Sequence, residues 1–226
     1  MKHAGKARQA GLKIVGLSLV IVLSIIGVWS FLAGRLLSAV SLIFGALWLL
    51  FLAFSLNFFR DPNANVPEEQ SAFVSPAHGT VDVIDEVSEK VFMGGRCRRI
   101  SIFLSVFDVH IQNAPIAGRI AHLQHCPGKF VNAMRSDCGS YNENVLLGIE
   151  STEVNNERVA VRLIAGLLAR RIIPWVTLGE TVAKGERTSL IQFGSRVDLY
   201  LPLSAQVRVQ LGAKVKGGET IMAMRS

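Results

Sequence analysis

The 226-residue chain is half hydrophobic and has a formal net charge of +7, which would suit a nucleic acid, an anionic membrane surface or an acidic substrate. Its basic residues form no dense stripe with interleaved aromatics, so the composition argues against nucleic acid. The three cysteines lie far apart without a C-x-x-C spacing, which excludes a disulfide framework and a cysteine zinc site.

Two apolar segments follow a basic tail, residues 1–13. Residues 14–33 and 36–56 are each about long enough for a helix to cross the hydrocarbon core, and Gly34-Arg35 separates them. Residues 14–56 are therefore predicted to be a two-helix membrane anchor, with a re-entrant hairpin as the alternative. A cleaved signal peptide fits poorly, because a second apolar segment follows at once.

The charges that flank this hairpin predict its orientation. Four basic residues precede it and Arg60 follows it, whereas the turn carries only Arg35. The positive-inside rule then puts both ends, and the folded domain, on the cytoplasmic face of the cell membrane.

A linker, residues 57–71, leads to a folded domain, residues 72–226, which is predicted to be mainly β. Short runs rich in Val, Ile and Phe are separated by Gly, Pro and Asn, as is typical of strands. These runs cover residues 80–87, 98–103, 158–163, 197–201 and 206–209. Residues 163–173 fit one short helix or a strand. We expect two packed sheets or a partly closed barrel.

Residues 178–186 and 211–219 share the spacing G-x-x-V-x-x-G-E. The two glycines supply turn geometry around a strand-like Val, so the pattern predicts one β-hairpin used twice. The spacing is similar to biotinyl and lipoyl carrier hairpins, but the carrier's lysine flanked by Met or Ala is missing.

Few residues stand out chemically on their own. His122, His125 and Cys126 suggest a metal, but nothing else supplies ligands at a typical spacing, so no metal is predicted. His110 ends an apolar run and precedes a turn at Pro115, where it would face a cleft or serve as a structural histidine. Gly194-Ser195 lies between two strand-like runs and, taken alone, is just a turn.

Taken in order, several segments point to one family. They are Phe59-Arg60-Asp61-Pro62, Ser75-Pro76-Ala77, and residues 102–115, 127–133, 164–172 and 193–202. On these segments the chain resembles phosphatidylserine decarboxylase proenzymes of the short bacterial and archaeal type. The likeness covers nearly all of the folded domain.

The resemblance implies that the protein breaks its own Gly194–Ser195 bond. The Ser195 hydroxyl attacks the preceding carbonyl, and β-elimination then yields an N-terminal pyruvoyl group on a small chain, residues 195–226, which stays attached to residues 1–194. The pyruvoyl ketone would form a Schiff base with the substrate amine and serve as electron sink, so that phosphatidylserine loses CO2 and becomes phosphatidylethanolamine. The implied partners are an anionic phospholipid, the membrane and a second copy in a homodimer.

The resemblance also assigns a base and reveals a departure. His110 matches the family's histidine and would activate the serine. The family usually reads Ser-Pro-Ala-Asp-Gly, with the aspartate orienting that histidine, whereas this chain has His78 at the aspartate position. Asp82 or Asp108 would be substitutes. The expected catalytic set is Ser195, His110 and His78.

Two other functions remain open on the sequence. A non-catalytic membrane protein would keep the fold and leave Ser195 uncut, and His78 favours that alternative. A membrane serine hydrolase would use Ser195 and His110, but nothing near Ser195 resembles a nucleophile elbow. The residues that bind the head group are not assigned, although Arg170, Arg171 and Arg196 are candidates.

Overall fold

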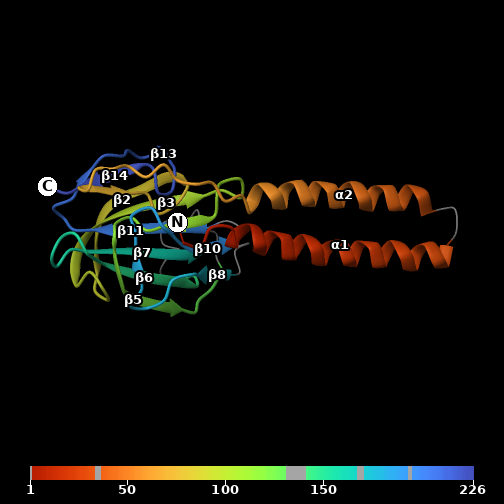
Figure 1. Ribbon diagram of the computed structural model, residues 1–226, viewed down its shortest axis with the longest axis horizontal. Helices are drawn as coiled ribbons and strands as arrows, with labels where there is room; N and C mark the ends of the chain where they lie inside the picture. The colour runs from red at the N-terminus through yellow and green to blue at the C-terminus, as the bar shows by residue number, and fades with distance from the viewer. Residues whose placement is uncertain (1, 34–36, 131–140, 167–170, 193–194) are drawn as a thin grey trace. The chain divides into compact units, whose positions relative to one another are not determined.

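A computed structural model describes residues 2–33, 37–130, 141–166, 171–192 and 195–226. The chain divides into two compact units, one formed by Gly5–Asp61 and the other by Met1–Ala4 with Pro62–Ser226. The first unit is helical and the second is built from β-strands (Figure 1).

The helical unit is a pair of long apolar helices, α1 (Lys6–Ala33) and α2 (Leu37–Phe58). At 1.5 Å per residue they are about 42 and 33 Å long, and both are long and apolar enough to cross a bilayer. The indole Nε1 of Trp48 in α2 donates a hydrogen bond to Ser18 Oγ of α1, at 3.1 Å. Such a bond satisfies two polar groups within an apolar pair of helices.

The β unit contains one large sheet and two small ones. The large sheet has the strand order β13 (Lys214–Val215), β2 (Gly79–Glu89), β3 (Gly95–Leu104), β11 (Ser195–Leu201), β7 (Arg158–Ala165), β6 (Asn144–Ser151), β5 (Gly118–Cys126) and β9 (Thr181–Val182). One small sheet has the order β1 (Ala72–Val74), β14 (Ile221–Met224) and β12 (Gln206–Val207). The other has the order β4 (Ile111–Asn113), β10 (Arg187–Gln192) and β8 (Arg171–Pro174).

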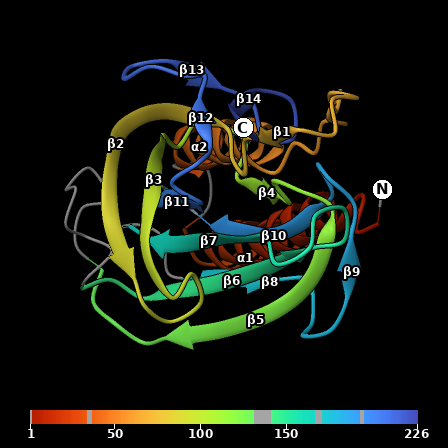
Figure 2. The same ribbon diagram turned by 90° about the vertical axis from the view of Figure 1, so that its left-hand side faces the viewer.

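The large sheet curls into half a barrel, as the bending of β2 and β5 in Figure 2 shows. The prediction of a mainly β domain with a partly closed barrel is therefore confirmed. In the segment left open between helix and strand, residues 163–165 belong to β7 and residues 171–173 to β8.

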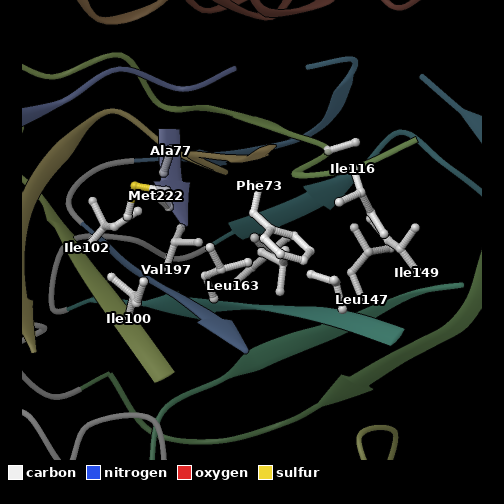
Figure 3. Packing of buried hydrophobic residues seen from close by; sticks show 14 of the residues in the cluster. Phe73, Ala77, Ile100, Ile102, Ile116, Leu147, Ile149, Leu163, Val197 and Met222 are labelled. Atoms are coloured by element: carbon white, nitrogen blue, oxygen red, sulfur yellow. The ribbon is translucent and has the colours of Figure 1, made fainter. Parts of the chain in front are cut away.

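The core lies inside the curl of the large sheet. Alternate residues of β11, namely Val197, Leu199 and Leu201, are completely buried there. Phe73 of β1 enters from a small sheet and packs among residues of the large one (Figure 3). Burying a side chain of that size contributes about 1.5–3 kcal/mol to folding.

The two copies of the G-x-x-V-x-x-G-E pattern form the two edge strands of the large sheet, β9 and β13. The first copy is anchored by Gly179 N donating to Ile120 O, and the second by Gly212 N donating to Val81 O, at 2.8 and 2.7 Å. All four pattern glycines have left-handed φ between +74° and +86°. The turn geometry is as predicted, but each copy pairs with a long neighbouring strand, β5 or β2, instead of forming its own hairpin.

The strands that pair with these copies, β5 and β2, also resemble each other. Asn113 N donates to Pro76 O, and Val74 N donates in return to Pro115 O, at 2.8 and 3.0 Å. Three residues after each proline, Gly79 and Gly118 open β2 and β5. Each strand then has a register shift two residues later. The mutual bonds, the glycine and the register shift occur at both prolines, which indicates that the half-barrel contains two copies of one local backbone arrangement.

Gly118→Ala tests this arrangement, because an added Cβ would lie 2.4 Å from Glu150 O and 2.6 Å from Ile149 Cγ2. We expect a loss of about 1–3 kcal/mol in the free energy of unfolding, measured by denaturant titration of the purified chain. Gly95→Ala is the matched control, since a Cβ at that strand position meets nothing within 4 Å. Equal free energies of unfolding for the two variants would contradict the close packing of Gly118 against Glu150 and Ile149.

Candidate functional site

Ser195 is the first residue of β11, an interior strand of the large sheet. It lies between Leu104 at the end of β3 and Ala165 at the end of β7. The residue is completely buried, and its Oγ has no hydrogen-bond partner within the described part of the chain. A buried hydroxyl without a partner costs free energy, so such a group often marks a functional site.

His110 is also completely buried, and its ring is held by its own segment. Nδ1 lies 2.9 Å from the carbonyl oxygen of Asp108. A carbonyl only accepts hydrogen bonds, so Nδ1 must carry the proton. In the neutral ring the lone pair is then on Nε2, which makes Nε2 the atom able to act as a base.

Backbone and side-chain hydrogen bonds fix the segment that carries His110. Its carbonyl oxygen accepts from Ile191 N of β10 at 3.1 Å and from Gln112 Nε2 at 2.6 Å. Gln112 Oε1 in turn accepts from Ser189 Oγ at 2.8 Å. His110 is therefore tied to β10, the strand that leads toward Ser195.

Two chain paths place His110 and Ser195 at the same end of the β unit. One runs from Leu104, the register partner of Ser195, through the turn to His110. The other runs from Ile191, which is bonded to His110, to Ser195, a span of four residues or at most about 14 Å of extended chain. Gly194 lies on this second path, outside the described residues.

His78 precedes β2 and lines a small cavity with Val109, Ile111 and Asn113. The structure therefore brings it to the segment that carries His110. A Cβ on Gly217 would lie 3.2 Å from His78 Nε2 and 2.6 Å from Asn113 Oδ1, so the imidazole and the amide converge on one point. The sequence reasoning missed Asn113, whose Nδ2 donates to Gly185 O at 2.9 Å.

The two acids considered as substitutes for the missing aspartate have different surroundings. Both carboxylate oxygens of Asp82 accept from the guanidinium of Arg196, which is almost fully buried. Burial raises the pKa of Asp82, and Arg196 opposes that rise. Asp108 instead accepts from Ser105 N through Oδ2, at 2.8 Å, and contacts the His110 ring through its backbone carbonyl.

The three arginines considered for the head group are placed differently. Arg196 has its guanidinium on Asp82. Arg171 is exposed at the start of β8, opposite Gln192. Arg170 lies outside the described residues.

A pair of asparagines near Ser195 was not singled out from the sequence. Asn142 Nδ2 donates to the carbonyl oxygen of Ala165, the register partner of Ser195, at 2.6 Å. Asn144 Nδ2 donates to Asn142 O at 2.9 Å, and Asn144 Oδ1 is buried without a partner among the described residues. Their buried amides add a polar wall to this end of the sheet.

The residues of the metal alternative have other contacts. His122 Nε2 lies 3.3 Å from Gln124 Oε1, and His125 Nε2 lies 3.2 Å from Glu143 Oε1. Over the described ranges, no group of three or more His, Cys, Asp or Glu side chains is arranged to hold a metal ion.

Comparison of the sequence with known proteins matches the chain to one family. A family profile described as phosphatidylserine decarboxylase matches residues 51–223. A phosphatidylserine decarboxylase proenzyme of Desulfotalea psychrophila is 46% identical over 176 residues, covering 78% of this chain and 81% of the relative. Proenzymes of the same name from Symbiobacterium thermophilum and Pelobacter propionicus are each 43% identical, over 75% and 84% of this chain and 78% and 85% of the relatives. The chain therefore belongs to the phosphatidylserine decarboxylase family.

Proposed function

We propose that the chain is made as a precursor that cuts itself between Gly194 and Ser195 and then converts phosphatidylserine to phosphatidylethanolamine. The family membership supports the decarboxylation, and the relatives' name, proenzyme, supports the cut. The observation that carries the proposal is the buried Oγ of Ser195, which has no hydrogen-bond partner among the described residues and lies four residues after Ile191, the β10 residue bonded to His110.

In the proposed cut, His110 Nε2 accepts the Ser195 hydroxyl proton while Oγ attacks the carbonyl carbon of Gly194. The peptide C–N bond breaks, and the Ser195 nitrogen takes a proton, which leaves an ester between the two segments. Loss of the Ser195 Cα proton then expels the Gly194 carboxylate and leaves a dehydroalanine. Water replaces its nitrogen, which departs as ammonia, and a pyruvoyl group remains.

The residues around Ser195 fit such a group. Its register partners are Leu104 and Ala165, and no charged side chain is needed to hold a small neutral ketone. The ketone would supply an electron sink for the carbon that loses CO2, a role that no side chain provides. Arrangement of the strands also supports retention of the small chain, because β11 is paired on both sides by strands of the large one.

The helical hairpin supports a membrane location for a lipid substrate. Both helices are long and apolar enough to span a bilayer, and many of their large apolar side chains are exposed. The flanking charges favour the cytoplasmic side for the β unit. A homodimer stays a prediction from the family resemblance.

A second candidate function is a non-catalytic lipid-binding protein, which His78 favours. Loss of the orienting carboxylate costs serine proteases about 10^4 in rate. Here the carbonyl of Asp108 already selects the required tautomer of His110, so part of the carboxylate's role is met by the backbone. Self-cleavage also needs to occur only once per molecule, so a slow reaction suffices.

Ser195→Ala tests the cut most directly. We expect the wild-type chain to give two masses under denaturing conditions, with the small fragment lighter than a hydrolysed one by the mass of ammonia. Ser195→Ala should give one mass, since it has no nucleophile. An uncut wild-type chain, measured by intact mass spectrometry after prolonged incubation, would favour the non-catalytic alternative.

His110→Gln tests the base. Removing a general base should slow cleavage by about 10^2–10^4, followed as the fraction of uncut precursor on denaturing gels over time. His125→Gln is the matched control, because His125 is more than half exposed and pairs with Glu143. Similar cleavage rates in both variants would remove His110 from the proposed role.

His78→Asp tests the departure from the family pattern. A carboxylate at this position should accelerate cleavage if the missing negative charge limits the rate. His78→Asn separates charge from shape, since the amide has the same outline without the charge. Cleavage no faster in His78→Asp than in His78→Asn would show that the charge at position 78 is not limiting.

A further inference from the structure

A cavity of about 320 Å³ lies within the helical unit, between the start of α1 and the end of α2. Its apolar walls come from Leu12, Val15, Leu56 and Phe59, and the rest of the lining is Arg8, Gly11, Ser55 and Arg60. This volume is within the range of small-molecule pockets in proteins. No residue of the proposed catalytic set lines it.

The shape of the cavity follows from close helix packing at this end of the hairpin. A Cβ on Gly11 would lie 2.8 Å from atoms of the Phe59 side chain, so the glycine lets that ring lie against α1. Leu12 and Leu56 are more than half exposed, whereas Phe59 is almost fully buried. The cavity therefore has a buried floor and a rim of exposed apolar side chains.

The charges at this end are strongly unbalanced. Residues 5–15 and 55–61 contain basic residues at positions 6, 8, 13 and 60 and one acid, Asp61. Asp61 Oδ2 accepts a hydrogen bond from Gly5 N at 2.6 Å, which ties the start of α1 to the end of α2. Arg60 is held at the end of α2 by donating to Asn57 O, also at 2.6 Å. The bonds bring Arg8 and Arg60 to one cavity.

We propose that this cavity binds one phospholipid with an anionic head group, with its phosphate at Arg8 and Arg60 and an acyl chain along Leu12, Val15 and Leu56. Guanidinium groups bind phosphate oxygens through paired N–H donors, and basic pockets between membrane helices suit anionic lipids. A soluble anion would leave the apolar walls uncovered. The inference rests on the proposed membrane anchoring, but not on cleavage at Ser195.

The test is binding of phosphatidylglycerol to the full chain in detergent, counted by native mass spectrometry. This lipid is anionic and lacks the serine carboxylate, so its retention does not report on the decarboxylation site. We expect one tightly held phosphatidylglycerol per chain and weaker retention of neutral phosphatidylcholine. Equal retention of the two lipids would overturn the assignment of the head group to the arginines.

Two double variants separate a built site from general surface charge. Arg8→Gln with Arg60→Gln should weaken phosphatidylglycerol binding about tenfold or more, since charge-assisted hydrogen bonds are lost. Lys6→Gln with Lys13→Gln removes the same charge from the same end but touches no cavity wall, and should change binding less than about twofold. An equal loss of phosphatidylglycerol binding in the two double variants would show that only the overall positive charge attracts the lipid, and would overturn the assignment of the head group to Arg8 and Arg60.

Val15→Phe tests the cavity itself while keeping both arginines. The larger ring should occupy the space of the acyl chain and lower phosphatidylglycerol binding about tenfold, with an unchanged melting temperature as the check on folding. Undiminished binding in a folded Val15→Phe chain would place the lipid outside the cavity and overturn the proposal.

Discussion

The structure depends on the pairing of β11 from its very first residue. Ser195 is in register with Leu104 on one side and with Ala165 on the other, and the strand continues to Leu201 between β3 and β7. Every second side chain, from Val197 to Leu201, is buried in the core. Ser195, the proposed nucleophile, is therefore held in place by two neighbouring strands. A chain cut just before it would keep these hydrogen bonds and this buried apolar surface.

The antiparallel order of the large sheet brings the candidate site residues together at one end of the sheet. The starts of β2, β11 and β6 lie beside the ends of β3 and β7. His78, Ser195 and Asn144, which are far apart in sequence, therefore lie at the same end of the sheet. The repeated arrangement around Pro76 and Pro115 adds His110, because Asn113 N bonds to Pro76 O. The segment around Asn113, which bonds to Pro76, therefore also positions His110, the candidate base.

Much of the architecture was readable from local patterns. The two long apolar runs predicted α1 and α2, and the alternating runs predicted long strands such as β3, β7 and β11. The glycine pattern predicted its turns, but not the strands with which each copy pairs. That partner choice could not be predicted, because Gly179 and Gly212 bond to Ile120 and Val81, which lie far away in sequence. Asn142 was also missed, because its role depends on the Ala165 carbonyl.

Motif order, segment length and periodicity are properties of the linear chain, so they were enough to predict the family, the position of the Gly-Ser pair and two apolar helices. Three contacts became visible only in the folded chain: Arg196 is bonded to Asp82, His78 converges with Asn113 beside Gly217, and Asp108 contacts the His110 ring through its backbone carbonyl. These contacts depend on which strands pair, on the direction of the backbone and on which side chains lie close enough to form an ion pair. A linear pattern does not encode those distances.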